Sequence, residues 1–170
     1  TVKDSIDVIK LGADRICIDG LMHDDLDMIK KISERLGVQA VIGVLPISWD
    51  INSIDWFDYR SKELKPISSK MLEAQSKVVS ELFLIDWNNE GKPNSFDNRL
   101  IVNFPKTDSP LIVFGGLNDI QQMAELLSNP KVAAIAVGNF LNYKEHSIQN
   151  FKKSLNGMPL RLPEYKIKYK

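Results

Sequence analysis

Three short apolar runs between residues 81 and 147 each end in a glycine-bearing turn, where a helix is expected to begin. The runs are ELFLIDW before NNEG, PLIVF before GGLND, and AAIAV before GNFLNY. Short buried strands followed by amphipathic helices are typical of parallel α/β architecture. Because glycine has no Cβ, glycines at consecutive strand ends let backbone N–H groups approach a ligand closely. The pattern therefore predicts one face of a barrel built to hold phosphate.

The rest of the chain repeats this alternation of short strands and helices. Asp24 or Asp25 can cap the start of a helix that Gly37 ends. The irregular aromatic segment 49–59 interrupts the alternation and is predicted to form a hairpin insertion. Strands are expected at residues 15–18, 40–45, 82–86, 111–114 and 134–137, and helices at 2–11, 25–36, 66–80, 98–104, 118–127 and 147–155.

Two architectures compete for this order of elements, an open doubly wound sheet and part of a (β/α)₈ barrel. The open sheet usually carries one dominant phosphate turn after its first strand, whereas barrels bind phosphate in the loops after strands seven and eight. The glycine turns here follow the last three strands. We therefore predict an α/β fold in which residues 1–170 form the C-terminal part of a single (β/α)₈ TIM barrel, strands four to eight.

Length and composition agree with one globular domain. The chain has 170 residues, of which 44% are hydrophobic and 26% charged. A full barrel usually needs more than about 200 residues, so about three βα units are expected upstream of Thr1. A natural half-barrel that dimerises is the alternative.

The charge balance limits the possible partners. Twenty-two basic residues offset 22 acidic ones, so no net field favours nucleic acid or an anionic membrane. The apolar runs are too short to span a bilayer and no signal peptide opens the chain, so a cytoplasmic location is predicted. The single cysteine, Cys17, excludes an internal disulfide and is expected to be buried in its apolar strand. With only His23 and His146 besides, no metal-ligand spacing is present, and neither a metal nor another cofactor is expected.

The segments that carry a family resemblance are LGADRICID followed by ISERLGVQAVIGV, then ELFLIDWNNEG, and finally PLIVFGGLNDIQQMAELL with AIAVGNFLNYKEHSI. In this order and spacing, residues 6–155 resemble the cyclase subunit of imidazole glycerol phosphate synthase, a (β/α)₈ barrel of histidine biosynthesis. That family closes an imidazole ring on a ribulose-phosphate intermediate with ammonia. The resemblance implies a glutaminase (glutamine amidotransferase) partner, which supplies the ammonia through the barrel interior, and a phosphorylated, sugar-like small-molecule substrate.

The family's substrate has two phosphates at opposite ends, and the resemblance assigns residues to both. Asp19 and Gly20 would form part of one phosphate site, although the family favours a neutral Asn at the position of Asp19 and a carboxylate repels phosphate. The other site would draw on glycine turns after the last three strands and the residue that follows them, namely Gly91, Gly115, Gly116, Gly138 and Asn139.

The resemblance also implies an ammonia gate and a proton-transfer set. Arg15 and Glu81 begin their strands where the family places a ring of opposite charges that gates ammonia, although ordinary surface charges or a structural ion pair remain alternatives. One catalytic Asp of the family would lie upstream of this chain, and the other aligns with Pro46, which cannot transfer a proton. Glu90 matches a third acidic position, and His23 is a proton carrier at the catalytic face that titrates near neutral pH.

Three functional hypotheses follow. The chain belongs to an ammonia-using cyclase of the histidine type, or to a paralogue that conveys ammonia for sugar amidation in bacterial surface-polysaccharide (lipopolysaccharide) biosynthesis, beside a sugar amidotransferase. The third hypothesis is a non-catalytic phosphate-binding scaffold. Pro46 and the altered loop NNEGKPNSFD favour the paralogue over the ordinary pathway enzyme.

Overall fold

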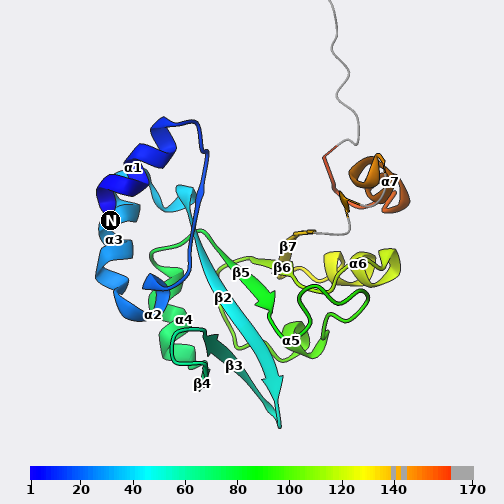
Figure 1. Cartoon of the computed structure of the whole chain (residues 1–170), viewed down its shortest axis with the longest axis horizontal. Coiled ribbons are helices and arrows are strands. Elements are labelled where there is room, and N and C mark those ends of the chain that lie inside the picture. Colours follow the sequence, from blue (N-terminus) through cyan, green and yellow to red (C-terminus); the bar gives the residue numbers. More distant parts are fainter. Residues whose placement is uncertain (139–140, 143–144, 162–170) are drawn as a thin grey trace, which may run out of the picture.

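The structure, a computed structural model, describes residues 1–138, 141–142 and 145–161. Its described strands form one seven-stranded, mostly parallel sheet flanked by helices (Figure 1). The parallel strands are β1 (Ile16–Ile18), β2 (Val41–Asp50), β5 (Glu81–Asp86), β6 (Leu111–Phe114) and β7 (Val132–Ile135). Each of them pairs with the next one along this series. Their spatial order therefore follows the chain order, without the reversal that defines a doubly wound sheet.

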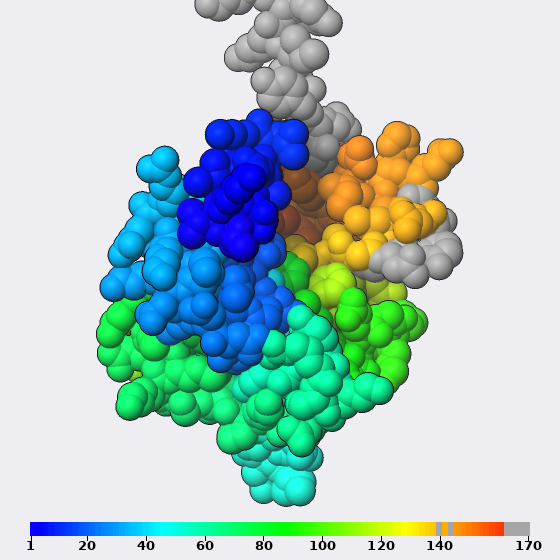
Figure 2. All heavy atoms as spheres, turned by 60° about the vertical axis from the view of Figure 1, so that its left-hand side comes forward, coloured from blue at the N-terminus to red at the C-terminus, as the bar shows by residue number. Residues whose placement is uncertain are grey.

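A hairpin extends the sheet beside the carboxyl end of β2. Strands β3 (Ser53–Asp58) and β4 (Glu63–Pro66) pair antiparallel with β2 and with each other. This confirms the predicted hairpin insertion. Figure 2 shows the tip between β2 and β3, in cyan, projecting below the rest of the molecule.

Most of the helices begin at a side-chain cap that the sequence supplies. Thr1, Asp25, Ser68 and Asp119 each accept a hydrogen bond from a backbone N–H in the first turn of the helix that follows. In Figure 1, α1 and α3 lie beside the β1 end of the sheet, and α6 and α7 lie beside the β7 end. The helices are α1 (Val2–Lys10), α2 (Leu21–Asp24), α3 (Leu26–Leu36), α4 (Ser69–Ser76), α5 (Arg99–Val102), α6 (Ile120–Leu127) and α7 (Ser147–Ser154), with a 3₁₀ turn at Val38–Ala40.

The strands divide their side chains between two faces. In β5, Leu82 and Leu84 are fully buried, whereas Phe83 and Ile85 are partly exposed. The register carries the Phe83 face across the sheet to Val44 of β2 and Ile112 of β6. We call this the inner face, because it is the face that a closed barrel would enclose.

Several predictions are wrong, and strand pairing explains each error. The helix expected from residue 66 starts only at Ser69, because Pro66 pairs with Asp55 in the hairpin. The strand expected to end at residue 45 runs to Asp50, since its second half pairs with β3. Cys17, expected to be buried, is exposed, because it lies on the inner face of β1, whose far edge has no partner strand among the described residues.

Candidate functional site

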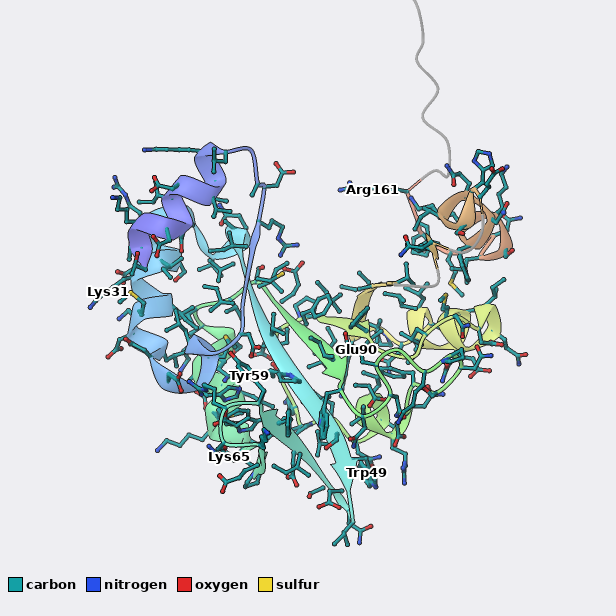
Figure 3. All side chains as sticks on the ribbon, viewed as in Figure 1. Lys31, Trp49, Tyr59, Lys65, Glu90 and Arg161 are labelled. Atoms are coloured by element: carbon teal, nitrogen blue, oxygen red, sulfur yellow. The ribbon has the colours of Figure 1, made fainter. Side chains whose placement is uncertain are left out.

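The loops that follow β5, β6 and β7 enclose a pocket of about 430 Å³. We call it the glycine pocket. Its lining includes Gly91, Gly115, Gly116 and Gly138, so the structure brings these four glycines together, and Glu90 lies among them. Asn139, the fifth residue predicted for this site, lies outside the described residues. Figure 3 shows Glu90 on the loop that leaves the carboxyl end of β5.

The glycine pocket offers backbone donors and one cation. Within the described part of the chain, the N–H groups of Gly115, Gly116 and Leu117 donate no hydrogen bond. They come just before α6, whose N-terminal end carries partial positive charge. Lys92, also in the lining, donates from Nζ to the carbonyl oxygen of Asn88 at 2.6 Å. Free N–H groups beside an ammonium are suited to an anion such as phosphate.

Packing also requires glycine at two of these positions. Gly115 and Gly116 adopt φ of +110° and +70°, where other residues are strained. A Cβ on Gly115 would lie 2.7 Å from the carbonyl oxygen of Asp86, and one on Gly116 would lie 2.4 Å from Ser95 Oγ. The loop after β5 therefore packs directly on the turn after β6, and this contact alone requires glycine.

The buried carboxylate of Asp86 holds that loop in place. It accepts hydrogen bonds from Asn89 Nδ2 and from the backbone N–H of Asp97, both at 2.8 Å. Burial raises the pKa of Asp86, and the Asn89 hydrogen bond opposes that rise. Asp86 does not line the glycine pocket. Its role in the described structure is to anchor the segment that carries Glu90 and Lys92.

The two residues predicted for the second phosphate site lie elsewhere. Asp19 and Gly20 line a separate groove of about 740 Å³ along β1, which we call the Asp19 groove, and it shares no lining residue with the glycine pocket. Burial raises the pKa of Asp19, with Arg60 acting in the opposite direction. The hydroxyl of Tyr59 comes within 3.4 Å of the position that a Cβ on Gly20 would take. Figure 3 shows Tyr59 on the hairpin, across β2 from Glu90.

His23 is turned toward the hairpin. Its ring stacks on Trp56, with centroids 3.4 Å apart and planes 1° from parallel. Burial lowers the pKa of His23 to about 4, so the ring is neutral near pH 7. Its Nε2 is buried and finds no partner among the described residues, and His23 lines neither the glycine pocket nor the Asp19 groove. The structure therefore does not bring the two candidate proton carriers, Glu90 and His23, into one pocket.

At the opposite, amino end of the strands, Arg15 and Glu81 form an ion pair. Arg15 also donates from Nε to the carbonyl oxygen of Gln39 at 3.1 Å and from Nη2 to Ser80 Oγ at 2.5 Å. The Ser80 hydroxyl lies within hydrogen-bonding distance of both the Glu81 carboxylate and the carbonyl oxygen of Val41, and it can donate to one of them at a time. Both charged side chains are partly exposed on the inner face, where the gate was predicted.

Pro46, which the resemblance aligns with a catalytic Asp of the family, is buried. Pro46 lies in β2 opposite Ile85 of β5. Beyond it, Ser48 is 1% exposed and its Oγ has no partner within the described chain, as is also true of Trp87 Nε1. Trp87 stacks on Phe57 of the hairpin at 4.0 Å between centroids. This end of β2 is therefore covered by aromatic rings and has two unpaired polar groups.

No cluster of three or more His, Cys, Asp or Glu side chains that could hold a metal ion occurs in the described ranges. None of the helices in those ranges is long and apolar enough to cross a membrane.

Residues 1–147 match the family described as "Histidine biosynthesis protein", whose fold is a (β/α)₈ barrel. The chain belongs to this family. A Campylobacter jejuni protein named "Putative imidazole glycerol phosphate synthase subunit hisF2" is 28% identical over 165 residues, which cover 95% of this chain and 66% of that protein. "Imidazole glycerol phosphate synthase subunit HisF" of Dehalococcoides mccartyi is 24% identical over 169 residues, with coverage of 95% and 66%. A Pseudomonas aeruginosa hisF2 protein with the same name as the Campylobacter one is 25% identical over 152 residues, with coverage of 86% and 60%.

The chain spans just under two thirds of the length of these relatives. Membership of the family confirms the resemblance seen in the sequence, and the mostly parallel α/β sheet agrees with its barrel fold.

Sequence reasoning missed three groups that the structure places at these sites. Lys92 joins the glycine pocket, Arg60 joins the Asp19 groove, and Ser48 lies buried beyond Pro46. Lys92 stands directly after Gly91 in a stretch already singled out, so its charge was a usable signal. No sequence signal pointed to Arg60 or Ser48, because only the folded hairpin brings these residues to their positions.

Proposed function

We propose that this chain is the carboxyl-terminal part of a (β/α)₈ barrel that acts as the cyclase-type subunit of imidazole glycerol phosphate synthase. The subunit uses ammonia delivered by a glutamine amidotransferase partner. The observation that carries the proposal is the polarity of the sheet. A charged pair occupies the amino end of the inner face, and a pocket lined by glycine turns and Lys92 occupies the carboxyl end. The two features can lie at opposite ends of the sheet because parallel strands place all their carboxyl ends on the same side.

The matching order of the strands in space and along the chain supports the barrel. Each parallel strand pairs with the next, and the parallel part of the described sheet ends at β1 and β7. Upstream βα units would pair with the free edge of β1 and close the sheet onto itself.

In this proposal the glycine pocket binds a phosphate of the ligand. The free N–H groups of Gly115, Gly116 and Leu117 donate to its oxygens, and Lys92 offsets its charge. Glu90 lies in the same pocket and is the acid–base candidate closest to that phosphate. His23 is neutral and packed beneath the hairpin, so proton transfer falls to Glu90 and to residues upstream of this chain.

Pro46 favours a second candidate function. Ring closure needs a general acid and a general base, and the resemblance aligns Pro46 with one of the family's carboxylates. Transfer of ammonia to another acceptor would not need that group at that position. A paralogue that conveys ammonia for sugar amidation in surface-polysaccharide biosynthesis, beside a sugar amidotransferase, meets this condition.

The deciding experiment uses the full-length protein, with the histidine-pathway ribulosyl phosphate intermediate and ammonium salt, and follows substrate loss by absorbance. Turnover supports the cyclase function. Tight binding without turnover, combined with stimulation of a partner glutaminase, supports the ammonia-conveying paralogue. Binding with neither activity would contradict both and leave a phosphate-binding scaffold. A Lys92→Ala variant, which removes the pocket's cation, is expected to weaken binding about tenfold. Lys77→Ala is the matched control, because Lys77 is an exposed lysine that pairs with Glu73 of α4 on the surface, away from the pocket lining.

A further inference from the structure

Two buried polar groups at the carboxyl end of the inner face have no hydrogen-bond partner within the described chain. They are Ser48 Oγ, on a residue that is 1% exposed, and Trp87 Nε1. Buried polar groups in proteins nearly always have a partner, because an unpaired one has lost its water and gained nothing in return. Two such groups side by side therefore indicate a small molecule that binds between them.

Strand pairing places the two groups next to each other. Ile47 pairs with Asp86 at the end of the ladder between β2 and β5, and the backbone N–H of Trp87 donates to the carbonyl oxygen of Ile47 at 3.3 Å. Ser48 and Trp87 are thus the next residues along the two strands. Both strands already have a partner on either side, so upstream βα units that pair with β1 would not come between them.

An apolar stretch of the inner face separates these groups from the ion pair at the amino end. Because alternate side chains share one face of a strand, the register gives the inner-face residues between the two ends. All of them on these two strands are apolar, namely Ile42, Val44 and Pro46 of β2 and Phe83 and Ile85 of β5. Along β2 and β5, a molecule moving from Arg15 and Glu81 would therefore meet its first polar side chains at Ser48 and Trp87.

Aromatic rings lie over this position. Phe57 of β3 and Trp87 come from opposite sides of β2, and their rings stack with planes 16° from parallel. The residue opposite Ser48 in β3 is Asp55, which bonds to neither unpaired group and accepts from Ser53 Oγ at 3.3 Å. A cation bound here would lose its hydration without a carboxylate bonded at the site, so the two groups suit a neutral molecule.

We propose that Ser48 and Trp87 bind neutral ammonia at the carboxyl end of the inner face, before it reacts. The indole N–H of Trp87 donates to the lone pair of ammonia, and Ser48 Oγ accepts one ammonia N–H. The inference rests on the proposed function, in which ammonia travels from the amino end of the strands to the carboxyl end, and it adds the residues that hold the ammonia there. It applies to the cyclase and to the ammonia-conveying paralogue alike.

The direct test follows the indole N–H signal of Trp87 by proton–nitrogen NMR in the full-length protein. The probe is ammonium chloride, with sodium chloride at the same concentration and pH as the salt control. The Trp87 signal is expected to shift with ammonium chloride alone, and to shift further as the pH rises at constant total ammonium, because the free base binds. The Trp49 and Trp56 indoles are internal controls and are expected not to move. Trp87→Phe, which keeps a stacking ring, assigns the signal.

Ser48→Ala tests the second group. It is expected to weaken the ammonia-dependent shift about threefold to tenfold, and to leave the midpoint of urea unfolding unchanged because Ser48 Oγ has no partner to lose. Ser33→Ala is the matched control, since it removes another buried serine hydroxyl, one that donates to the carbonyl oxygen of Lys30 within α3. The control is expected to keep the full shift.

Amination driven by ammonium salt gives an independent readout. Ser48→Ala and Trp87→Phe are expected to raise the KM for ammonia about threefold to tenfold with little change in kcat, because they remove binding of ammonia before it reacts. A Trp87 signal that responds equally to both salts would overturn the inference, since water or an upstream segment would then occupy the site. So would a shift that falls as the pH rises, or one that Ser48→Ala leaves unchanged. Failure of the proposed function appears elsewhere, as absent amination and absent glutaminase stimulation, while the NMR shift is still measurable.

Discussion

The two halves of the sheet build their carboxyl-end sites in different ways. Around β5 and β6 the glycine pocket is made of backbone, with turns that only glycine can form and a loop anchored by one buried carboxylate. Around β1 and β2 the Asp19 groove is made of side chains, with a hairpin tied down by ion pairs among Asp24, Asp58 and Arg60. Backbone donors suit an anion, and carboxylates suit hydroxyls. The difference is that one half of the sheet positions its carboxyl-end loops through backbone geometry and the other half through ion pairs.

The largest effect on stability is expected in the glycine pocket, where the backbone leaves no room for a Cβ on Gly116. In Gly116→Ala the new Cβ would meet Ser95 Oγ at 2.4 Å and the carbonyl oxygens of Asn89 and Lys92 at 3.0 Å. We expect the free energy of unfolding to fall by about 3 kcal/mol, from overpacking added to backbone strain. Urea denaturation measures it. Gly12→Ala is the control, because Gly12 has φ of +107° with nothing within 4 Å and reports strain alone. Equal losses in the two variants would show that the loop does not press on the turn.

A smaller loss is expected from removing the anchor of the same loop. Asp86→Ala leaves the N–H of Asp97 and the amide of Asn89 without their acceptor. The expected cost is about 2 kcal/mol, with weaker ligand binding because Glu90 and Lys92 lose their support. Asp86→Asn keeps one acceptor oxygen and should recover part of both losses. If Asp86→Ala destabilised the protein and left ligand affinity unchanged, the loop would not shape the pocket.

The half of the sheet that carries the hairpin should lose stability as the pH falls, because His23 becomes protonated more readily in the unfolded chain. His23 has a pKa of about 4 in the folded protein against an ordinary histidine pKa of 6.5, with burial as the main cause. The unfolded chain therefore binds the proton first as the pH falls, and stability is lost between about pH 6.5 and pH 4. Because the ring is partly exposed, the loss attributable to His23 is about 1 kcal/mol. His23→Phe keeps an aromatic ring on Trp56 and should lose this slope in a series of unfolding curves. An unchanged slope would mean that His23 is not held neutral.

The smallest effect on stability is expected from the ion pair at the amino ends of the strands. Arg15 and Glu81 are expected to couple by about 0.5–1 kcal/mol in a double-mutant cycle with alanine, because their pair is partly shielded and shares Ser80. The exposed pair of Lys77 and Glu73 should couple more weakly, by about 0.3 kcal/mol. Equal couplings would place the Arg15 pair among ordinary surface ion pairs.

Local patterns account for what the sequence predicted well. The strand at Leu111–Phe114 was placed without error, because a short apolar run between a proline and a glycine pair leaves little freedom. The glycines of the pocket could be grouped before the structure was known, since all follow the carboxyl ends of parallel strands. The helix that Gly37 ends was likewise readable from adjacent residues, with its cap narrowed to Asp24 or Asp25, of which the structure uses Asp25.

Non-local pairing accounts for what was missed. The second half of β2 is a strand because β3 pairs with it, and no window of the sequence contains that information. The same hairpin brings Arg60 to Asp24, 36 residues away, and covers Trp87 with Phe57. The electrostatics of the Asp19 groove therefore depended on tertiary contacts that a pattern of residue types does not encode.

The proposed function requires ammonia to enter at the amino end of the strands and to react at the carboxyl end. The most direct measurement compares amination driven by glutamine, through the glutaminase partner, with amination driven by ammonium salt, in the full-length protein. We predict that Arg15→Glu lowers the ratio of the two rates at least about tenfold, and that adding Glu81→Arg, which restores an ion pair of reversed polarity, recovers much of it. A ratio that stays unchanged in both variants would contradict this route, because ammonia would then not pass between these two residues.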